Sequence, residues 1–283
     1  MRLQEDDAGR GGWDSALSVA RISPFAAVAG FIDKTVALAE IEVRKLRHDF
    51  TELITRAAQP VLWFVLFGEV MTRARAFPTG AVAYRDFLAP GILAQSVLFV
   101  SIFYGIAVIW ERDLGVVNKY LVSPTPRTAL VLGKALSAGV RGLSQALIIF
   151  LLALALGVHL RWHPLALLGV VAVVIIGAAL FSTFSLIIAC VVKTRERFMG
   201  IGQVLTMPLF FASNAIYPIE LMPGWLRVVS TVNPLTYEVD ALRTLMLNDW
   251  SSGFGIGVDF AVLLATTTVL VIIGARLYPR VVI

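Results

Sequence analysis

Two long uncharged runs constrain the fold of this chain more than any other feature. Residues 87–110 carry no charged side chain over 24 positions, and residues 164–192 carry none over 29. About 20 apolar residues suffice for a helix to cross the hydrocarbon core of a bilayer. The composition agrees, because only 15% of the 283 residues are charged and 58% are hydrophobic. We therefore expect an integral membrane protein.

Shorter apolar runs add four expected spans. They lie at about 56–72, 135–158, 198–213 and 255–275. The charged turn 193–197 leaves room only for a tight antiparallel hairpin between the two spans that it joins. The predicted fold class is therefore an all-α, polytopic membrane protein with six transmembrane helices.

The N-terminal part of the chain predicts a tail and a surface helix. Residues 1–32 show no sustained period and predict a flexible cytoplasmic tail, whose acidic start argues against a cleaved signal peptide. Between residues 33 and 56, apolar positions recur every three or four residues with charges between them, which is typical of an amphipathic helix. We expect this helix on the membrane surface. A soluble helix packed on a partner is the alternative.

The distribution of positive charge predicts the orientation. The segments on the side of the termini hold 17 of the 24 Lys and Arg residues, and the opposite loops hold six. Cytoplasmic loops carry the excess of such residues. We expect a multi-pass protein of the plasma (inner) membrane with both termini cytoplasmic. The orientation of the chain in the membrane thus accounts for the net charge of +5, and we expect no nucleic-acid partner.

Two segments outside the expected spans are candidates for function. The cytoplasmic one, 111–127, predicts a short helix ended by a stiff turn at two prolines. Its apolar residues Leu114, Val117, Leu121 and Val122 favour a docking surface for another protein over a solvated loop.

The external segment, 214–250, is too apolar for a disordered loop and is interrupted by proline and glycine, so it predicts broken helices. Its candidate residues are Pro218, Glu220, Pro223, Trp225, Asn233, Pro234, Tyr237, Asp240 and Arg243.

Together these motifs resemble a known family. The cytoplasmic ones are Glu111-Arg112 with Gly115, Ser123-Pro124 and Leu132-Gly133-Lys134, and the external ones are Met222–Leu226 and Asn233–Arg243. With six spans and a preceding surface helix, they resemble the permeases of type-2 ABC exporters, particularly the drug and antibiotic exporter branch. The sequence departs from the family pattern at Asp113, where a second glutamate is common, and at Val116, where a threonine is common.

The resemblance implies an architecture and a set of partners. Residues 33–283 would form a single type-2 ABC transporter transmembrane domain that pairs with a second copy of itself or with a related membrane subunit. A separate ATP-binding cassette subunit, carrying ATP and Mg, would dock beneath the chain. The implied coupling residues are Glu111, Arg112, Asp113, Leu114, Gly115 and Leu121. The implied activity is outward movement of an amphipathic drug, antibiotic or lipid-like substrate, with a lipid-linked glycan as the alternative within the family.

Enzyme and cofactor motifs are missing from the sequence. Gly133-Lys134 is followed by Ala135, so no Walker motif is present to cradle ATP phosphates. Gly142–Ala146 fails the G-x-S-x-G pattern at its last position. The histidine pair His159 and His163 has no third metal ligand nearby. We expect neither catalysis nor a cofactor in this chain, and we assign a packing role to its single cysteine, Cys190.

Two other functions stay open. Glu69 and Asp259 lie near the ends of expected spans, where carboxyl groups of a proton-coupled secondary transporter can relay protons. A membrane scaffold or sensor subunit would need neither an ATPase nor a substrate flux.

Overall fold

The described part of the molecule is helical. A computed structural model describes residues 55, 58–74, 77, 82–115, 117, 127–192, 194–248 and 250–278. All regular elements in these ranges are helices, apart from one isolated antiparallel bridge between Leu160 and Leu247. The all-α prediction is therefore confirmed for this part of the chain. The predicted tail 1–32 and surface helix 33–56 lie outside the described residues, except for Thr55.

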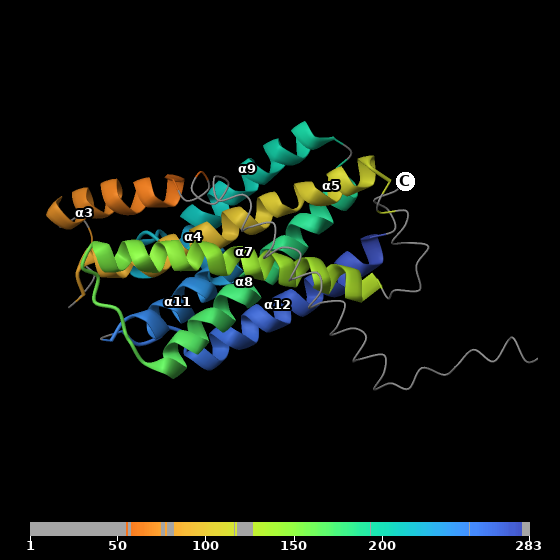
Figure 1. Cartoon of the computed structure of the whole chain (residues 1–283). Helices are drawn as coiled ribbons and strands as arrows, with labels where there is room; N and C mark the ends of the chain where they lie inside the picture. The colour runs from red at the N-terminus through yellow and green to blue at the C-terminus, as the bar shows by residue number, and fades with distance from the viewer. Residues whose placement is uncertain are drawn as a thin grey trace, which may run out of the picture.

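Four long helices form the bundle. They are α4 (Tyr84–Tyr104), α7 (Arg127–Ala155), α8 (Pro164–Val191) and α12 (Ile256–Leu277), and α8 packs against the other three (Figure 1). Helix α5 (Ile106–Asp113) continues the direction of α4 after an interruption at Gly105. The stretches long and apolar enough to cross a membrane are Tyr84–Asp113, Leu130–Ala155, Pro164–Val191 and Ile256–Leu277. These stretches coincide with four of the predicted spans.

The two remaining predicted spans are helical but shorter. The first, 56–72, contains a π-helical turn, η1 (Trp63–Phe67), followed by α3 (Gly68–Ala74). The other, 198–213, corresponds to α9 (Arg195–Phe211), a helix of 17 residues. Neither is among the candidate membrane-crossing helices of the described chain, so the predicted count of six spans is not confirmed.

The third predicted span, 135–158, starts inside a longer helix. Helix α7 begins at Arg127, and its Lys134 forms an ion pair with Glu111. It ends at Ala155, where the amide of Val158 donates to Ala153 O at 2.9 Å and that of Gly157 to Leu154 O at 3.0 Å. This bond pattern is a Schellman motif, a common helix end that the span prediction did not consider.

The predicted broken helices of the external segment are present. They are the 3₁₀ turn η2 (Ile219–Leu221), α10 (Gly224–Val232) and α11 (Pro234–Met246). After each interruption a proline marks the start of the next helix: Pro223 precedes the first residue of α10, and Pro234 is the first residue of α11. Proline is favoured there since the first amides of a helix have no partner within it.

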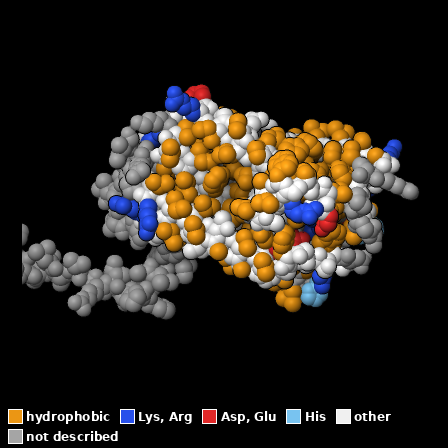
Figure 2. All heavy atoms as spheres, turned by 180° about the vertical axis from the view of Figure 1, so that it is seen from behind, with side chains coloured by type: hydrophobic (Ala, Val, Ile, Leu, Met, Phe, Trp, Pro, Cys, Tyr) orange, Lys and Arg blue, Asp and Glu red, His pale blue; other side chains and the backbone are white. Residues whose placement is uncertain are grey.

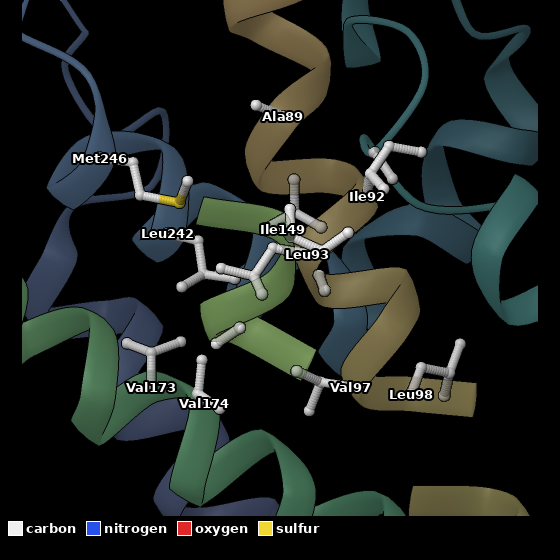
Figure 3. Close-up of a cluster of buried hydrophobic side chains, with 14 of the residues drawn as sticks. Ala89, Ile92, Leu93, Val97, Leu98, Ile149, Val173, Val174, Leu242 and Met246 are labelled. Atoms are coloured by element: carbon white, nitrogen blue, oxygen red, sulfur yellow. The ribbon is translucent and has the colours of Figure 1, made fainter. Parts of the chain in front are cut away.

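Hydrophobic side chains from α4, α7, α8 and α11 interlock in the main core (Figure 3). Leu93 and Val97 of α4 point towards Ile149 of α7 and Val174 of α8, whereas Ile92 projects to the other side of α4. The outside of the bundle is also apolar, and Figure 2 shows hydrophobic side chains across its middle with charged ones towards its ends. Such a surface suits contact with lipid.

Candidate functional site

The predicted coupling residues lie at the end of α5. Leu114 and Gly115 close the helix, with the amide of Leu114 donating to Trp110 O at 3.0 Å and that of Gly115 donating to Arg112 O at 2.9 Å. Gly115 has φ +70°, a conformation that favours glycine. The Leu114 side chain is 72% exposed. An exposed leucine next to charged residues is available to a docking partner.

Ion pairs connect this helix end to two other helices. Glu111 Oε2 lies 2.5 Å from Lys134 Nζ on α7, and Asp113 Oδ2 lies 2.7 Å from Arg195 Nη2 on α9. Asp113 also accepts from the adjacent Arg112 at 3.1 Å. These pairs bring together segments that are 23 and 82 residues apart in sequence.

Arg195 also stacks on an aromatic ring. Its Cζ lies 3.5 Å from the centroid of the Trp110 indole on α5, well within the range of a cation–π interaction. The same guanidinium therefore holds both Trp110 and Asp113, three positions apart on α5. Helical residues three apart share a face, which explains why one side chain reaches both.

Most of the predicted coupling set lies together, and three of its partners were missed. Glu111, Arg112 and Asp113 form the charged cluster and Leu114 and Gly115 follow it, whereas Leu121 lies outside the described residues. The partners that the prediction did not include are Trp110, Lys134 and Arg195. The only feature of the sequence that could have indicated these three residues is their position, since all three stand at span ends on the predicted cytoplasmic side.

The external candidates divide into buried and exposed residues. Pro223, Glu220 and Trp225 are exposed, Trp225 by 71%, whereas Pro218 and Tyr237 are half-buried. Tyr237 donates to Thr231 O at 2.7 Å and so ties α11 to α10.

Asn233 fixes the junction between α10, α11 and α9. Its side-chain oxygen accepts from the amide of Leu235 at 3.0 Å and caps α11, while its Nδ2 donates to Leu209 O of α9 at 2.7 Å. The adjoining Pro234 starts α11. This is an N-cap with a second, tertiary function.

Arg243 is the most buried of the external candidates, at 1% exposure. Its guanidinium lies 3.7 Å over the Phe87 ring and donates to Phe87 O at 3.3 Å and to Asn214 O at 2.9 Å. Burial lowers the pKa of Arg243 to about 9, opposed by the negative charge of Asp240, so the side chain remains charged at neutral pH. Arg243 therefore joins α11 to α4 and to the turn after α9.

Asp240 holds the turn that leads into α12. Its Oδ2 accepts from Ser252 Oγ at 2.8 Å, from the Gly253 amide at 2.9 Å and from the Phe254 amide at 3.3 Å. Ser252 Oγ also lies 3.0 Å from Asp259 Oδ2 in the first turn of α12.

Glu238 was not among the predicted candidates, although it is fully buried. Neither carboxyl oxygen has a hydrogen-bond partner among the described residues, and a Cβ at Gly177 of α8 would overlap the carboxyl group. Burial raises the pKa of Glu238 well above its ordinary value. The sequence pattern of α11 did not indicate whether the side chain of Glu238 faces solvent or the inside of the bundle.

The two acids considered for proton coupling differ in their surroundings. Glu69 pairs with Arg73 at 2.8 Å and with Arg85 at 2.6 Å. Asp259 is fully buried beside Ser252. His159 lies 3.0 Å from Asp86, and among the described residues no three potential metal ligands of the His, Cys, Asp and Glu types gather.

Comparison with known proteins places the chain in a family. The family model described as ABC-2 type transporter matches residues 34–247. The putative transport permease ycf38 of Cyanophora paradoxa is 30% identical over 220 residues, which cover 76% of this chain and 74% of that protein.

Two further relatives are named for drug transport. The daunorubicin resistance ABC transporter permease protein DrrB1 of Streptomyces coeruleorubidus is 25% identical over 83% of this chain and 80% of its own length. The probable multidrug ABC transporter permease YbhR of Escherichia coli is 31% identical over 59% of this chain and 45% of its own length. With its family match over most of its length, this chain belongs to the ABC-2 type transporter family.

Proposed function

We propose that the chain is the membrane subunit of an ATP-binding cassette exporter that moves an amphipathic drug, antibiotic or lipid-like substrate outward. ATP and Mg bind to a separate subunit, which docks on the end of α5, and two membrane subunits pair around the substrate pathway. The positive-charge distribution supports cytoplasmic termini, and we assign the subunit to the plasma (inner) membrane as part of the proposal. The proposal is supported by the family membership and by the names of two relatives, DrrB1 and YbhR, which refer to drug transport.

One observation carries the coupling part of the proposal. The end of α5 presents an exposed Leu114 beside charged residues that are braced to α7 and to α9. Movement of this helix end by a docked subunit would be passed directly to α7 and α9 through these ion pairs. The pairing of Glu69 with two arginines makes Glu69 a poor proton carrier, so the proton-coupled alternative would depend on the buried Asp259.

A co-purification experiment tests the docking site. The tagged chain is extracted from its host in mild detergent, and stoichiometric partners are assayed for ATPase activity. We expect a roughly equimolar ATPase with the wild type and its loss with the double substitution Glu111→Ala and Arg112→Ala. A matched control, Glu220→Ala with Arg227→Ala, removes charges from the opposite end and should leave the complex intact.

The outcomes separate the functions. A well-folded wild type that repeatedly brings no ATPase contradicts the exporter proposal and favours the secondary transporter or the scaffold. The substrate class is tested in a strain that lacks the gene. Accumulation of an amphipathic drug would indicate efflux and a contribution to antibiotic resistance, whereas a missing surface polymer would indicate export of a lipid-linked glycan.

A further inference from the structure

A second hydrophobic cluster lies at the end of the bundle that carries the coupling residues. It is separate from the main core, and its buried members are Val108, Ile109, Val117, Val131, Leu186, Ala189, Cys190, Phe198, Val271, Ala275 and Tyr278. They come from α5, α7, α8, α9 and the end of α12, together with Val117 beyond α5. The end of the bundle is therefore packed as a unit of its own, beneath the main core.

The boundary between the two clusters coincides with the interruption between α4 and α5. At this point the amide of Gly105 donates to Ile102 O at 3.2 Å, an i→i−3 bond, and Ser185 Oγ of α8 also donates to Ile102 O. Gly105 itself has φ −59° and ψ −21°, so α5 keeps the direction of α4 while the hydrogen-bond ladder is interrupted at this residue. A Cβ at Gly105 would overlap Ser185 and approach Phe198 of α9 to 3.0 Å. Helix α5 thus begins at a glycine wedged between α8 and α9.

Helix α9 is attached differently at its two ends. Its C-terminal part is held by Asn233 and by the Trp63 ring against Phe210 and Phe211, whereas Met199 and Val204 nearer its start are 51% and 69% exposed. Along its length it packs mainly against α4, α5 and α8. At its first turn, Phe198 is fully buried in the second cluster and Arg195 holds Trp110 and Asp113 of α5. The start of α9 is therefore bound to α5 by one buried ring and one guanidinium.

We propose that Arg195 is a positioning residue that makes α9 follow α5, so that movement of the coupling segment about Gly105 is transmitted to α9. The inference rests on the proposed function, because it assumes that a docked ATPase moves the end of α5. Arg195 gives two kinds of attachment, the ion pair with Asp113 and the stacking on Trp110. The ion pair is partly exposed and is therefore weak alone, and the stacked ring adds to it.

Helix α7 offers a contrast to α9. Lys134 also pairs with Glu111, but α7 is packed along α8 and α4 in the bundle. The same displacement of α5 therefore meets more resistance from α7 than from α9. This difference selects α9 as the helix that moves.

Hydrogen exchange of the purified full chain in lipid nanodiscs tests the attachment without nucleotide. In Asp113→Asn and in Arg195→Gln, we expect exchange at amides 106–113 and at amides 196–200 to rise together by about fivefold. Arg195→Lys should give a smaller rise, because it keeps the charge but not the flat stacked group. Exchange that rises in only one of the two helices, or in neither, would overturn the attachment.

Distance measurements on the complex with its co-purified ATPase test the transmission. Spin labels are placed at Met199 on α9 and at Trp162 in the exposed turn before α8, with Cys190→Ser as background. We expect addition of ATP and Mg to change the distance in the wild type and to leave it unchanged in Arg195→Gln, although ATP is still hydrolysed. The exchanged pair Asp113→Arg with Arg195→Asp should restore part of the change, since it rebuilds the ion pair without the stacking.

The control and the contrary results are distinct. Arg73→Gln removes a comparable surface pair at the other end of the molecule and should keep the full distance change. An unaltered change in Arg195→Gln, with the ATPase bound and active, overturns the inference and leaves the proposed function standing. If the wild type recruits no ATPase, the proposed function fails, and the hydrogen-exchange result alone decides whether Arg195 joins the two helices.

Discussion

Glu238 places a carboxyl group deep inside the bundle, against the backbone of α8. Its raised pKa means that the folded chain retains a proton that the unfolded chain loses above the ordinary value of 4.5. In that range the unfolded state binds fewer protons than the folded state, so stability falls as pH rises.

We therefore expect Glu238→Gln, which is neutral at every pH, to reduce this loss and to be more stable than the wild type at neutral pH. Thermal unfolding in detergent between about pH 5 and about pH 8 measures the difference. The exposed Glu220→Gln serves as the control and should retain the pH dependence of the wild type. Equal pH slopes in Glu238→Gln and in the wild type would show that Glu238 is not the titrating group.

Arg243 depends on the shape of its side chain as well as on its charge. A lysine in its place keeps the charge but cannot lie flat over Phe87 while donating to both Phe87 O and Asn214 O. We expect Arg243→Lys to lower the free energy of unfolding by about 3 kcal/mol, the scale of a broken buried charge network. Denaturant-induced unfolding of the full chain provides the measurement, with the exposed Arg227→Lys as control. A loss no larger than that of the control would contradict this account.

At the scale of elements, Ser252 ties α11 to the start of α12. Its hydroxyl contacts Asp240 and Asp259 and accepts from the Gly255 amide at 2.6 Å. We expect Ser252→Ala to destabilise this junction by about 1–3 kcal/mol, because buried polar groups lose their partner. Faster hydrogen exchange confined to amides 253–259 would report it, and Ser252→Thr should stay close to the wild type. Exchange that rises equally along all of α12 would instead indicate global unfolding.

The helices also explain which boundaries were predictable from sequence. The limits of α8 and α12 agree with the prediction to within two residues, because clear signals flank both apolar runs: Pro164 and Lys193 for α8, and Gly255 and Arg276 for α12. Helix α7 starts eight residues before the predicted span, because hydropathy locates the apolar part of a helix and contains no information about the pairing of Lys134 with Glu111, 23 residues earlier. A charged residue stays in a helix at a span end when a partner from another element neutralises it.

At the scale of the whole molecule, the question is whether α9 crosses the membrane. Single cysteines at His163, Trp225 and Glu196, in a Cys190→Ser background, test this with a membrane-impermeant maleimide on intact cells. If α9 crosses, His163 and Trp225 both lie outside and react, whereas Glu196 reacts only after permeabilisation. Reaction of His163 without Trp225 would place both ends of α9 on the cytoplasmic side and contradict the six-span topology.

The sequence by itself determined the class of the protein, its apolar helices and the broken helices of the external segment. These follow from local properties: helices formed by uninterrupted hydrophobic runs satisfy their own backbone hydrogen bonds in lipid, and proline favours the start of a helix, as at Pro223 and Pro234. Proline alone does not end a helix, since Pro90 and Pro208 stand inside α4 and α9. The resemblance to type-2 ABC exporter permeases also depended on short motifs, and the family match confirms it.

Only the tertiary structure decided which charged residues are paired and which are buried. Asp113 and Arg195 lie 82 residues apart, and the residues next to Glu238 in sequence do not reveal that its side chain is buried while that of Glu220 is exposed. Each of these environments is created by side chains from other helices, whose approach depends on the packing of the whole bundle. A pattern along one segment gives no information about that packing. The ion pairs at the end of α5 and the buried carboxyl group of Glu238 were therefore found only in the folded chain.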